Sequence, residues 1–147
     1  MKVVVQRVTS SKVTVDNEVI GSIDNGLNVL VGFTQTDTIT DLEYIKRKVL
    51  NLRIFDDENG VMNKSILDTN GKILLISQFT LYGDTKKGNR PSYINALNGE
   101  QAVVLYNKFI EMLSTDIEVE TGKFGADMKV EIHNDGPITI IIDSNNK

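Results

Sequence analysis

An almost uninterrupted apolar run covers residues 27–33. Its length and composition predict a β-strand that is buried on both faces, since a half-exposed strand would alternate polar and apolar side chains. β-Branched residues dominate two earlier segments, residues 2–8 and 12–15, which we also expect to be strands. Between these and the apolar run, the pair Asp16-Asn17 predicts a hairpin turn into a strand over residues 18–23.

Two later segments have the periodicity of amphipathic helices. The first has Thr40 and Glu43 at its start, a pair that fits a capping box, and the second has Asn98 with Gln101 as its capping pair. Each helix would bury one apolar stripe. The residues expected in these stripes are Leu42, Ile45, Val49 and Leu52 in the first helix, and Ala102, Leu105, Tyr106, Phe109, Met112 and Leu113 in the second.

The remaining strands are expected over residues 72–81, 117–121, 128–134 and 138–143, with a tight turn between the last two. The order of elements is therefore strands, helix, strand, helix and strands. This order predicts an α/β fold with a mixed sheet, and the length predicts a single domain over residues 1–147.

Composition excludes several kinds of site. The chain has no cysteine, which rules out a disulfide framework, a thiolate zinc site and a cysteine nucleophile. Its net charge of −4 is unlike that of a protein that coats nucleic acid, because phosphate contacts dominate such binding. If RNA is the substrate, the contact should therefore be local and fairly small.

We expect no targeting segment in this chain. The apolar run after Met1 is too short for a signal peptide, and no cleavage site follows it. No stretch approaches the length of a membrane span. These features predict a cytoplasmic protein with no membrane partner.

The chain has one histidine, His133, whereas a Ser-His-Asp triad needs a histidine to take the proton of its nucleophile. In a strand over residues 128–134, His133 would share the polar, solvated face with Lys129 and Glu131. We therefore expect an exposed surface histidine, and neither a histidine-based triad nor a multi-histidine metal site.

Polar residues end the apolar strand that begins at Lys72. In the segment Ser77-Gln78-Phe79-Thr80, strand geometry would place Gln78 and Thr80 on one face and Ser77 and Phe79 on the other. Polar groups at the end of a buried strand need hydrogen-bond partners or a pocket. From the spacing alone, an ordinary strand end with satisfied polar groups is the simpler interpretation.

A second polar segment is the hexapeptide Asn-Asp-Gly-Pro-Ile-Thr at residues 134–139. Its first three residues predict a tight turn, and Pro137 should lie at a strand start or edge because it cannot donate a ladder hydrogen bond. The Gly136-Pro137 bond could be cis, a form far less costly before proline than elsewhere. From the spacing alone, a plain hairpin turn is the simpler interpretation.

Two further segments place charged or large apolar side chains near glycine and other small residues. A short basic loop contains Lys86, Lys87 and Arg90, which could hold phosphates, although basic loops are usually only solvated. A later segment places small residues beside Phe124 and Met128. That arrangement suits either core packing or the wall of a pocket.

Taken together, these segments resemble the bacterial and eukaryotic D-aminoacyl-tRNA deacylases, also called D-tyrosyl-tRNA deacylases. The resemblance rests first on Ser-Gln-Phe-Thr at residues 77–80 and Asn-x-Gly-Pro-x-Thr at residues 134–139. Both motifs, in this order and in a chain of this length, are highly specific. The other matching segments are Gln6-Arg7-Val8, Arg53-Ile54-Phe55, Met62-Asn63, Gly88-Asn89-Arg90-Pro91-Ser92 and residues 121–128.

The resemblance implies a barrel-like core with two main helices, in a homodimer whose active sites lie at the subunit interface. It implies hydrolysis of the ester bond of D-aminoacyl-tRNA, and of mischarged glycyl-tRNA, with release of free amino acid and tRNA. The partner would be the 3′ acceptor end of an aminoacylated tRNA, so we expect no DNA partner, no cofactor and no metal.

The resemblance also assigns roles to individual residues. The dipeptide Gly136-Pro137, inserted as a cis unit from the partner subunit, would reject L-aminoacyl substrates, and Arg7 would help to hold it. The residues expected in the catalytic pocket are Ser77, Gln78, Phe79 and Thr80; those for substrate binding and chiral selectivity are Gly136, Pro137, Arg7, Asn134, Thr139, Phe124 and Met128. From the charge of the basic loop, we expect Lys86, Lys87 and Arg90 to contact tRNA phosphates.

Ester hydrolysis needs an activated water and a stabilised oxyanion. In the absence of a triad, the backbone N–H groups of Phe79 and Thr80 are the natural oxyanion donors. The 2′-hydroxyl of the terminal ribose would help to position or activate the water. A nucleophilic Thr80 is the alternative, but nothing in the sequence identifies a base that could deprotonate it.

Two other classes of function stay open. The chain could be a non-catalytic dimer that binds RNA or another partner, with pocket polar groups that are merely structural. It could instead hydrolyse small N-acyl or ester metabolites without RNA. Deacylation of charged tRNA, with and without RNase digestion of the substrate, separates the three functions.

Overall fold

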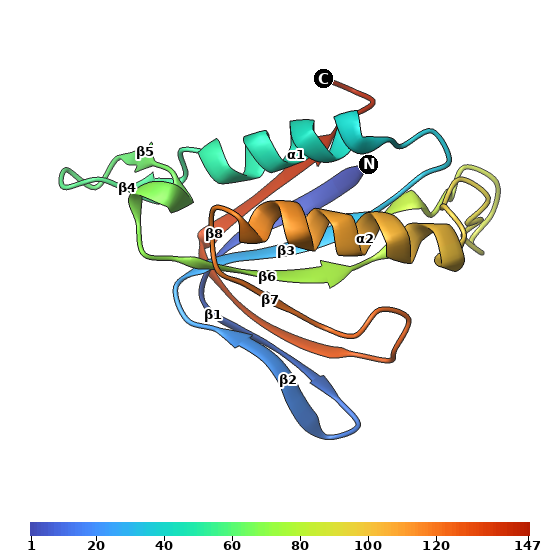
Figure 1. The fold of residues 1–147 in the computed structure, drawn as a ribbon, viewed down its shortest axis with the longest axis horizontal. Coiled ribbons are helices and arrows are strands. Elements are labelled where there is room, and N and C mark those ends of the chain that lie inside the picture. Colours follow the sequence, from blue (N-terminus) through green and yellow to red (C-terminus); the bar gives the residue numbers. More distant parts are fainter.

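The computed structural model describes residues 1–147 and confirms the α/β class (Figure 1). The strands of its main sheet are β1 (Lys2–Val15), β2 (Glu18–Ile23), β3 (Gly26–Gly32), β6 (Lys72–Ser77), β7 (Val119–Thr121) and β8 (Lys129–Asp143). They lie in the order β2-β1-β3-β6-β7, and β8 pairs with the other side of β1. The helices α1 (Ile39–Asn51) and α2 (Gly99–Ser114) lie on one face of this sheet.

The smaller elements lie between the main ones along the chain. They are β4 (Phe55–Asp56) and β5 (Met62–Lys64), which pair as a separate hairpin, and the 3₁₀ helices η1 (Ile66–Asp68) and η2 (Phe79–Tyr82). The strands β3, β6 and β7 run parallel to one another, whereas β1 is antiparallel to its three neighbours. The predicted mixed sheet is therefore confirmed.

One long strand replaces the two that the sequence predicted at the start of the chain. Strand β1 pairs with β3 through its first half and with β2 through its second half. Because β1 changes neighbours midway, the sheet curls and brings β2 toward β7. A Cβ atom on Gly21 of β2 would lie 2.5 Å from the backbone oxygen of Thr121 of β7. This near closure gives the barrel-like core that the resemblance implied.

Two apolar cores lie on opposite faces of β3 and β6. The larger one, of 19 buried residues, fills the space between the sheet and the two helices, and it receives Leu27, Val29 and Val31 from β3. The smaller one, of five buried residues, lies inside the curl of the sheet, where Leu30 packs against it. The prediction of a strand buried on both faces is confirmed.

Helix α1 begins two residues earlier than the sequence indicated. Its N-cap is Thr38, whose backbone N–H donates to the Asp41 carboxylate over 2.8 Å. The predicted box of Thr40 and Glu43 is therefore wrong, because Thr40 already lies inside the helix. At α2 the predicted cap is confirmed, since the Asn98 side chain accepts a hydrogen bond from the Gln101 N–H. Neither helix combines the length and the apolar composition that crossing a membrane requires.

The predicted turn between two closing strands is also wrong. Strand β8 is continuous and pairs with β1 along both of its halves. Thr139 is opposite Gln6 and Asn134 is opposite Val8, so the four residues 135–138 bulge out opposite the single residue Arg7. The hexapeptide at residues 134–139 therefore forms a wide bulge in one strand, in place of a hairpin.

Candidate functional site

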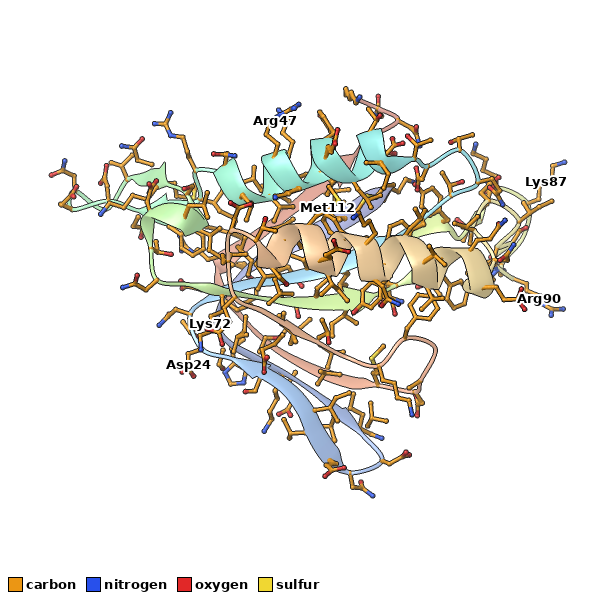
Figure 2. All side chains as sticks on the ribbon, viewed as in Figure 1. Asp24, Arg47, Lys72, Lys87, Arg90 and Met112 are labelled. Atoms are coloured by element: carbon orange, nitrogen blue, oxygen red, sulfur yellow. The ribbon has the colours of Figure 1, made fainter.

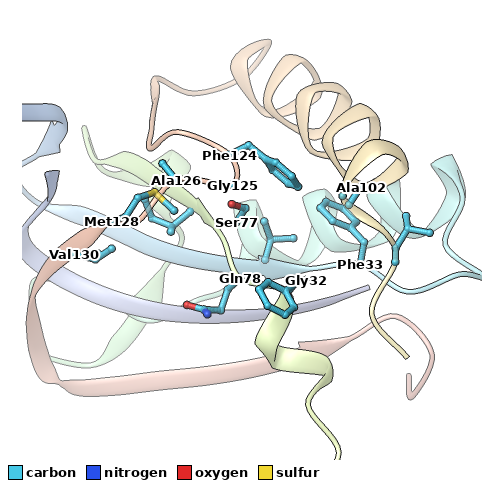
Figure 3. Close-up of a pocket in the computed structure, with 15 residues that line it drawn as sticks. Gly32, Phe33, Ser77, Gln78, Ala102, Phe124, Gly125, Ala126, Met128 and Val130 are labelled. Atoms are coloured by element: carbon cyan, nitrogen blue, oxygen red, sulfur yellow. The ribbon is translucent and has the colours of Figure 1, made fainter. Parts of the chain in front are cut away.

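A cavity of about 510 Å³ opens at the carboxyl ends of the parallel strands β3 and β6 (Figure 3). This is the edge of an α/β sheet at which ligands commonly bind. Its wall is mostly apolar and is built from the ends of these strands, the start of α2 and the segment that leads into β8. Among the polar side chains at the wall are Ser77 and Gln78.

The segment that follows β6 leaves the sheet at Ser77. The Gln78 N–H donates the last sheet-like hydrogen bond, to the Val31 carbonyl over 2.6 Å, and the chain then turns into the 3₁₀ helix η2. The predicted strand over residues 72–81 is therefore too long by four residues. The expected alternation of faces fails there, because the Gln78 amide donates to the Thr80 hydroxyl over 2.5 Å.

Ser77, Gln78 and Phe79 line the cavity, whereas Thr80 is exposed and lies outside its wall. Phe79 and Thr80 open the helix η2, so their N–H groups have no acceptor within it. Such free N–H groups are suited to bind an oxyanion or a carbonyl oxygen. The catalytic roles expected of these four residues stay predictions.

Phe124 and Met128 lie on the opposite wall of the same cavity (Figure 3). The Phe124 ring packs against Tyr106 of α2, with 5.5 Å between ring centroids. Gly122 makes room for Met128, since a Cβ atom there would lie 2.5 Å from the Met128 Sδ. The two interpretations that the sequence allowed both hold, because Phe124 and Met128 line the cavity and also pack against the two cores, while contact with adenine stays a prediction.

Tyr106 fixes this wall to the sheet. Its hydroxyl donates to the Leu75 carbonyl of β6 over 2.8 Å, inside the larger core. Burial raises the pKa of the Tyr106 hydroxyl above its ordinary value, because the charged phenolate would have to be desolvated. The hydroxyl is therefore neutral and structural, and it supplies no base to the cavity.

The dipeptide Gly136-Pro137 projects from the bulge in β8. Its peptide bond is cis, and Gly136 has φ of +122°, a conformation that favours glycine. Both residues are exposed, and neither lines the cavity of its own chain. Asn134 and Thr139 fasten the base of the bulge, since the Asn134 amide donates to the Thr139 hydroxyl over 3.0 Å.

Arg7 lies beneath the bulge and is buried. Its Nη1 donates to the Ile54 carbonyl over 2.8 Å and lies 3.3 Å from Asp56 Oδ1. Its Nε lies 3.2 Å from Asp135 Oδ2, an ion pair without hydrogen-bond geometry. Arg7 therefore contacts the residue before the dipeptide on one side and the β4–β5 hairpin on the other.

Lys86, Lys87 and Arg90 lie in the exposed loop between η2 and α2. Figure 2 shows Lys87 and Arg90 at one end of the molecule. A pair of backbone hydrogen bonds between Asp84 and Ser92 closes this loop at its base. None of the three cations forms an ion pair within the chain. Their role toward phosphates stays a prediction.

Several other residues also bear on the predicted chemistry. His133 is exposed, as the alternation of β8 predicted. The sequence interpretation missed Phe33 and Ala102 in the cavity wall, and it missed Asp56 and Asp135 as partners of Arg7. Phe33 could have been found, because it ends the apolar run of β3 beside the end of β6.

Comparisons with known proteins agree with one another. Residues 4–143 match the family model described as D-Tyr-tRNA(Tyr) deacylase. The chain is 61% identical to the D-aminoacyl-tRNA deacylase of Clostridium botulinum (strain Loch Maree / Type A3), over 98% of this chain and 97% of that protein. It is 60% identical, with the same coverage, to the protein of that name from strain Eklund 17B / Type B.

Two solved structures have the same fold. One, described as the c-Myc DNA Unwinding Element Binding Protein, has a TM-score of 0.93 and 47% identity, over 97% of this chain and 98% of that chain. The other, described as a probable eukaryotic D-amino acid tRNA deacylase, has a TM-score of 0.82 over 96% of this chain and 97% of that chain. At 18% identity, this second likeness shows the fold alone.

Proposed function

The chain belongs to the D-Tyr-tRNA(Tyr) deacylase family, and from this premise we propose that it hydrolyses the ester bond of D-aminoacyl-tRNA, releasing D-amino acid and tRNA. Mischarged glycyl-tRNA is a second substrate, because glycine has no side chain to reject. The site is completed by a second copy of the chain, so that the working enzyme is a homodimer.

The observation that carries this proposal is the position of Gly136-Pro137. The dipeptide is exposed, it is fastened at its base, and it lies outside the cavity that holds Ser77, Gln78 and Phe79. Within one chain, the two family motifs therefore do not form one site. Insertion of Gly136-Pro137 of the partner subunit into the cavity would join them.

Chirality is selected by rejection in this arrangement. The backbone of Gly136-Pro137 presents a wall without a side chain that could rotate away. An L side chain would run into this wall, whereas a D side chain would point out of the cavity. Arg7, through Asp135, together with Asn134 and Thr139, keeps the bulge in place.

Catalysis relies on positioning and on backbone dipoles. The free N–H groups of Phe79 and Thr80 stabilise the oxyanion, and Phe124 and Met128 hold the terminal adenine against the opposite wall. The 2′-hydroxyl of the terminal ribose positions or activates the water. No His, Asp or Glu lines the cavity to act as a general base, which favours this RNA-assisted route over a protein nucleophile.

The decisive experiment is deacylation of tRNA charged with D-tyrosine, L-tyrosine or glycine. We expect rapid loss of the D-tyrosyl and glycyl esters and little loss of the L-tyrosyl ester above the uncatalysed rate. RNase digestion of the charged tRNA should slow turnover if RNA is recognised. A binding protein would leave all three esters intact, and a hydrolase of small metabolites would be indifferent to digestion.

The mechanism is tested by a substrate whose terminal ribose lacks the 2′-hydroxyl. We expect this 2′-deoxy substrate to bind but not to turn over. Full turnover would contradict the RNA-assisted route and leave the D-aminoacyl ester specificity untouched.

A further inference from the structure

Two aromatic rings are exposed beside the mouth of the cavity. The side chains of Phe79 and Tyr93 are 56% and 41% exposed, and the other aromatic side chains of the chain are more buried. The two rings meet edge to face, with 5.1 Å between centroids and 69° between planes. Since Phe79 also lines the cavity, this aromatic pair continues the cavity outward.

The segment that carries Tyr93 is held in place by hydrogen bonds. The Thr34 hydroxyl donates to the Asn95 carbonyl over 2.6 Å, and the Gln35 amide donates to the Ile94 carbonyl over 2.9 Å. Gly83 brings the backbone close to the Tyr93 ring, since a Cβ atom there would lie 3.2 Å from Tyr93 Cε1. The aromatic pair is therefore ordered before any ligand binds, which reduces the entropy lost on binding.

Three cations precede Tyr93 in the chain, on the loop between the paired residues Asp84 and Ser92. Lys86, Lys87 and Arg90 lie between the paired residues Asp84 and Ser92, directly before Tyr93, and none has an acidic partner. Exposed aromatic rings beside unpaired cations form the usual site for single-stranded nucleic acid, in which bases stack and phosphates pair with the cations. A wholly apolar partner would not need these charges.

We propose that Phe79 and Tyr93 form a stacking platform for the unpaired base that precedes the terminal adenosine of the substrate RNA, while the cations of the loop hold its phosphates. This inference rests on the proposed function, because it places the terminal adenosine in the cavity. Phe79 then acts twice, through its N–H at the ester and through its ring under the base.

The test compares D-aminoacyl-tRNA with the same tRNA made abasic at the nucleotide before the terminal adenosine. For the unmodified protein, removal of the base should lower kcat/KM by about 5- to 150-fold, which corresponds to the loss of one base–aromatic stack. Tyr93→Ala and Tyr93→Leu should lower kcat/KM on the intact tRNA to a similar extent. On the abasic tRNA neither variant should cause a further loss, and Tyr93→Phe should behave like the unmodified protein on both.

Tyr44 provides a matched control. It lies on α1, outside the cavity wall, and it too is surrounded by cations, with Arg47, Lys48 and Lys147 between 4.6 and 5.7 Å from its ring centroid. Tyr44→Ala should leave the ratio of the two kcat/KM values unchanged. A change in that ratio as large as that of Tyr93→Ala would overturn the platform.

The remaining outcomes are distinct. Equal losses on intact and abasic tRNA in the Tyr93 variants would reject stacking and leave the proposed function in place. A fall to monomers in sedimentation of Tyr93→Ala would show that a second copy covers the ring, and it would also reject the platform. No turnover of either tRNA by the unmodified protein would contradict the proposed function itself.

Discussion

The two motif segments of this chain differ in what holds them. Residues 77–80 follow a buried strand, so the sheet, the helix α2 and the larger core fix their position. Residues 134–139 form an exposed bulge on β8, fixed by polar contacts from Asn134, Thr139 and Arg7. One segment is supported mainly by packing, and the other mainly by a few hydrogen bonds and one ion pair, with Ile138 packed against the larger core.

This difference indicates how each segment works. A segment supported by packing has its geometry within a single chain, and the cavity beside it exists without a partner. In the exposed bulge, Ile138 packs against the larger core, but Gly136 and Pro137 are exposed and belong to neither core. Under the proposed function, the shape of this dipeptide serves a contact with the partner subunit. Changes at the bulge should therefore affect activity more than stability, and changes beneath the cavity should do the reverse.

The largest effect is expected for Gly136→Ala. At φ of +122° an added Cβ atom is strained, and it would lie 2.8 Å from Ile138 Cγ1. A shift of about 1 Å in the bulge can lower a rate roughly 100-fold, so we expect D-aminoacyl-tRNA cleavage to fall by about that factor. Single-turnover deacylation measures the fall, and thermal unfolding should show a change of only a few degrees.

Gly60→Ala is the control for backbone strain. Gly60 also has a positive φ, of +75°, but nothing lies near its missing Cβ and it is exposed in the β4–β5 hairpin. The control should lose a similar amount of stability and keep its activity. If the two variants cleaved D-aminoacyl-tRNA at the same rate, the bulge would have no special role in activity.

A smaller loss is expected when the ion pair beneath the bulge is broken. Asp135→Asn keeps the size of the side chain but removes its charge, so Arg7 Nε loses its partner at 3.2 Å. Asp135 is half-exposed, and we expect roughly a tenfold fall in D-substrate cleavage relative to L-substrate cleavage, since positioning errors weaken selectivity. The ratio of the two deacylation rates measures it.

Glu131→Gln is the matched control for that variant. Glu131 lies on the same strand and pairs with Lys12 of β1 at 3.4 Å, in a similarly exposed position. Surface pairs of this kind contribute little to stability. An equal loss of selectivity in both variants would show that β8 responds to any lost charge, and not to the contact with Arg7.

The sequence predicted the packed parts of the molecule better than the bulge. A continuous apolar run identified β3, and apolar periodicity identified both helices, because burial leaves an apolar pattern in the sequence. The pocket role of residues 77–80 came from the resemblance, and the strand geometry expected there was wrong. The hexapeptide at residues 134–139 has the composition of a hairpin turn, and nothing local tells a turn from a bulge. Only the pairing of β8 with the whole length of β1, which is a long-range property, decides between them.

Contacts between side chains that are far apart in the chain could likewise not be predicted from the sequence. Arg7 was expected near the dipeptide through the resemblance, but its contacts with Ile54 and Asp56 join segments about 50 residues apart. The end of β6 was placed too late because Phe79 and Leu81 continue the apolar pattern, whereas the chain leaves the sheet at Ser77. Hydrogen bonding of the backbone, and not hydrophobicity, ends that strand.

On the packed side of the comparison, Tyr106→Phe should affect stability more than rate. The lost hydroxyl leaves the buried Leu75 carbonyl without its donor, which costs about 1 kcal/mol of the free energy of unfolding. Denaturant unfolding at neutral pH measures this cost, and kcat should stay within about twofold because the aromatic wall against Phe124 remains. Tyr44→Phe on α1, whose hydroxyl makes no hydrogen bond, should cost nothing measurable. A large fall in kcat on Tyr106→Phe would contradict the structural role assigned to the Tyr106 hydroxyl.

Because Tyr106 is buried, we also expect the free energy of unfolding to fall at alkaline pH. Burial raises the pKa values of Tyr106 and Tyr82 in the folded state, so folding favours the protonated hydroxyls. Their contribution is fully present below the ordinary tyrosine pKa of about 10 and is lost as the pH rises above it, by about 1.4 kcal/mol per pH unit for the more deeply buried Tyr106. Tyr106→Phe should therefore flatten the fall of unfolding free energy above pH 10, and an unchanged slope would contradict the assignment.

The smallest effect is expected for Thr80→Ala, at the exposed end of the packed segment. The Thr80 hydroxyl accepts a hydrogen bond from the Gln78 amide, and a side-chain amide cannot take a proton from it. Under the proposed mechanism, Thr80 contributes its backbone N–H, which alanine keeps, so deacylation should fall by no more than about threefold. Quenched reactions followed by mass spectrometry should show no acyl-enzyme in either protein. If Thr80→Ala were nearly inactive while the 2′-deoxy substrate was cleaved normally, Thr80 would be the nucleophile, and the packed segment would supply the reacting atom as well as the oxyanion donors.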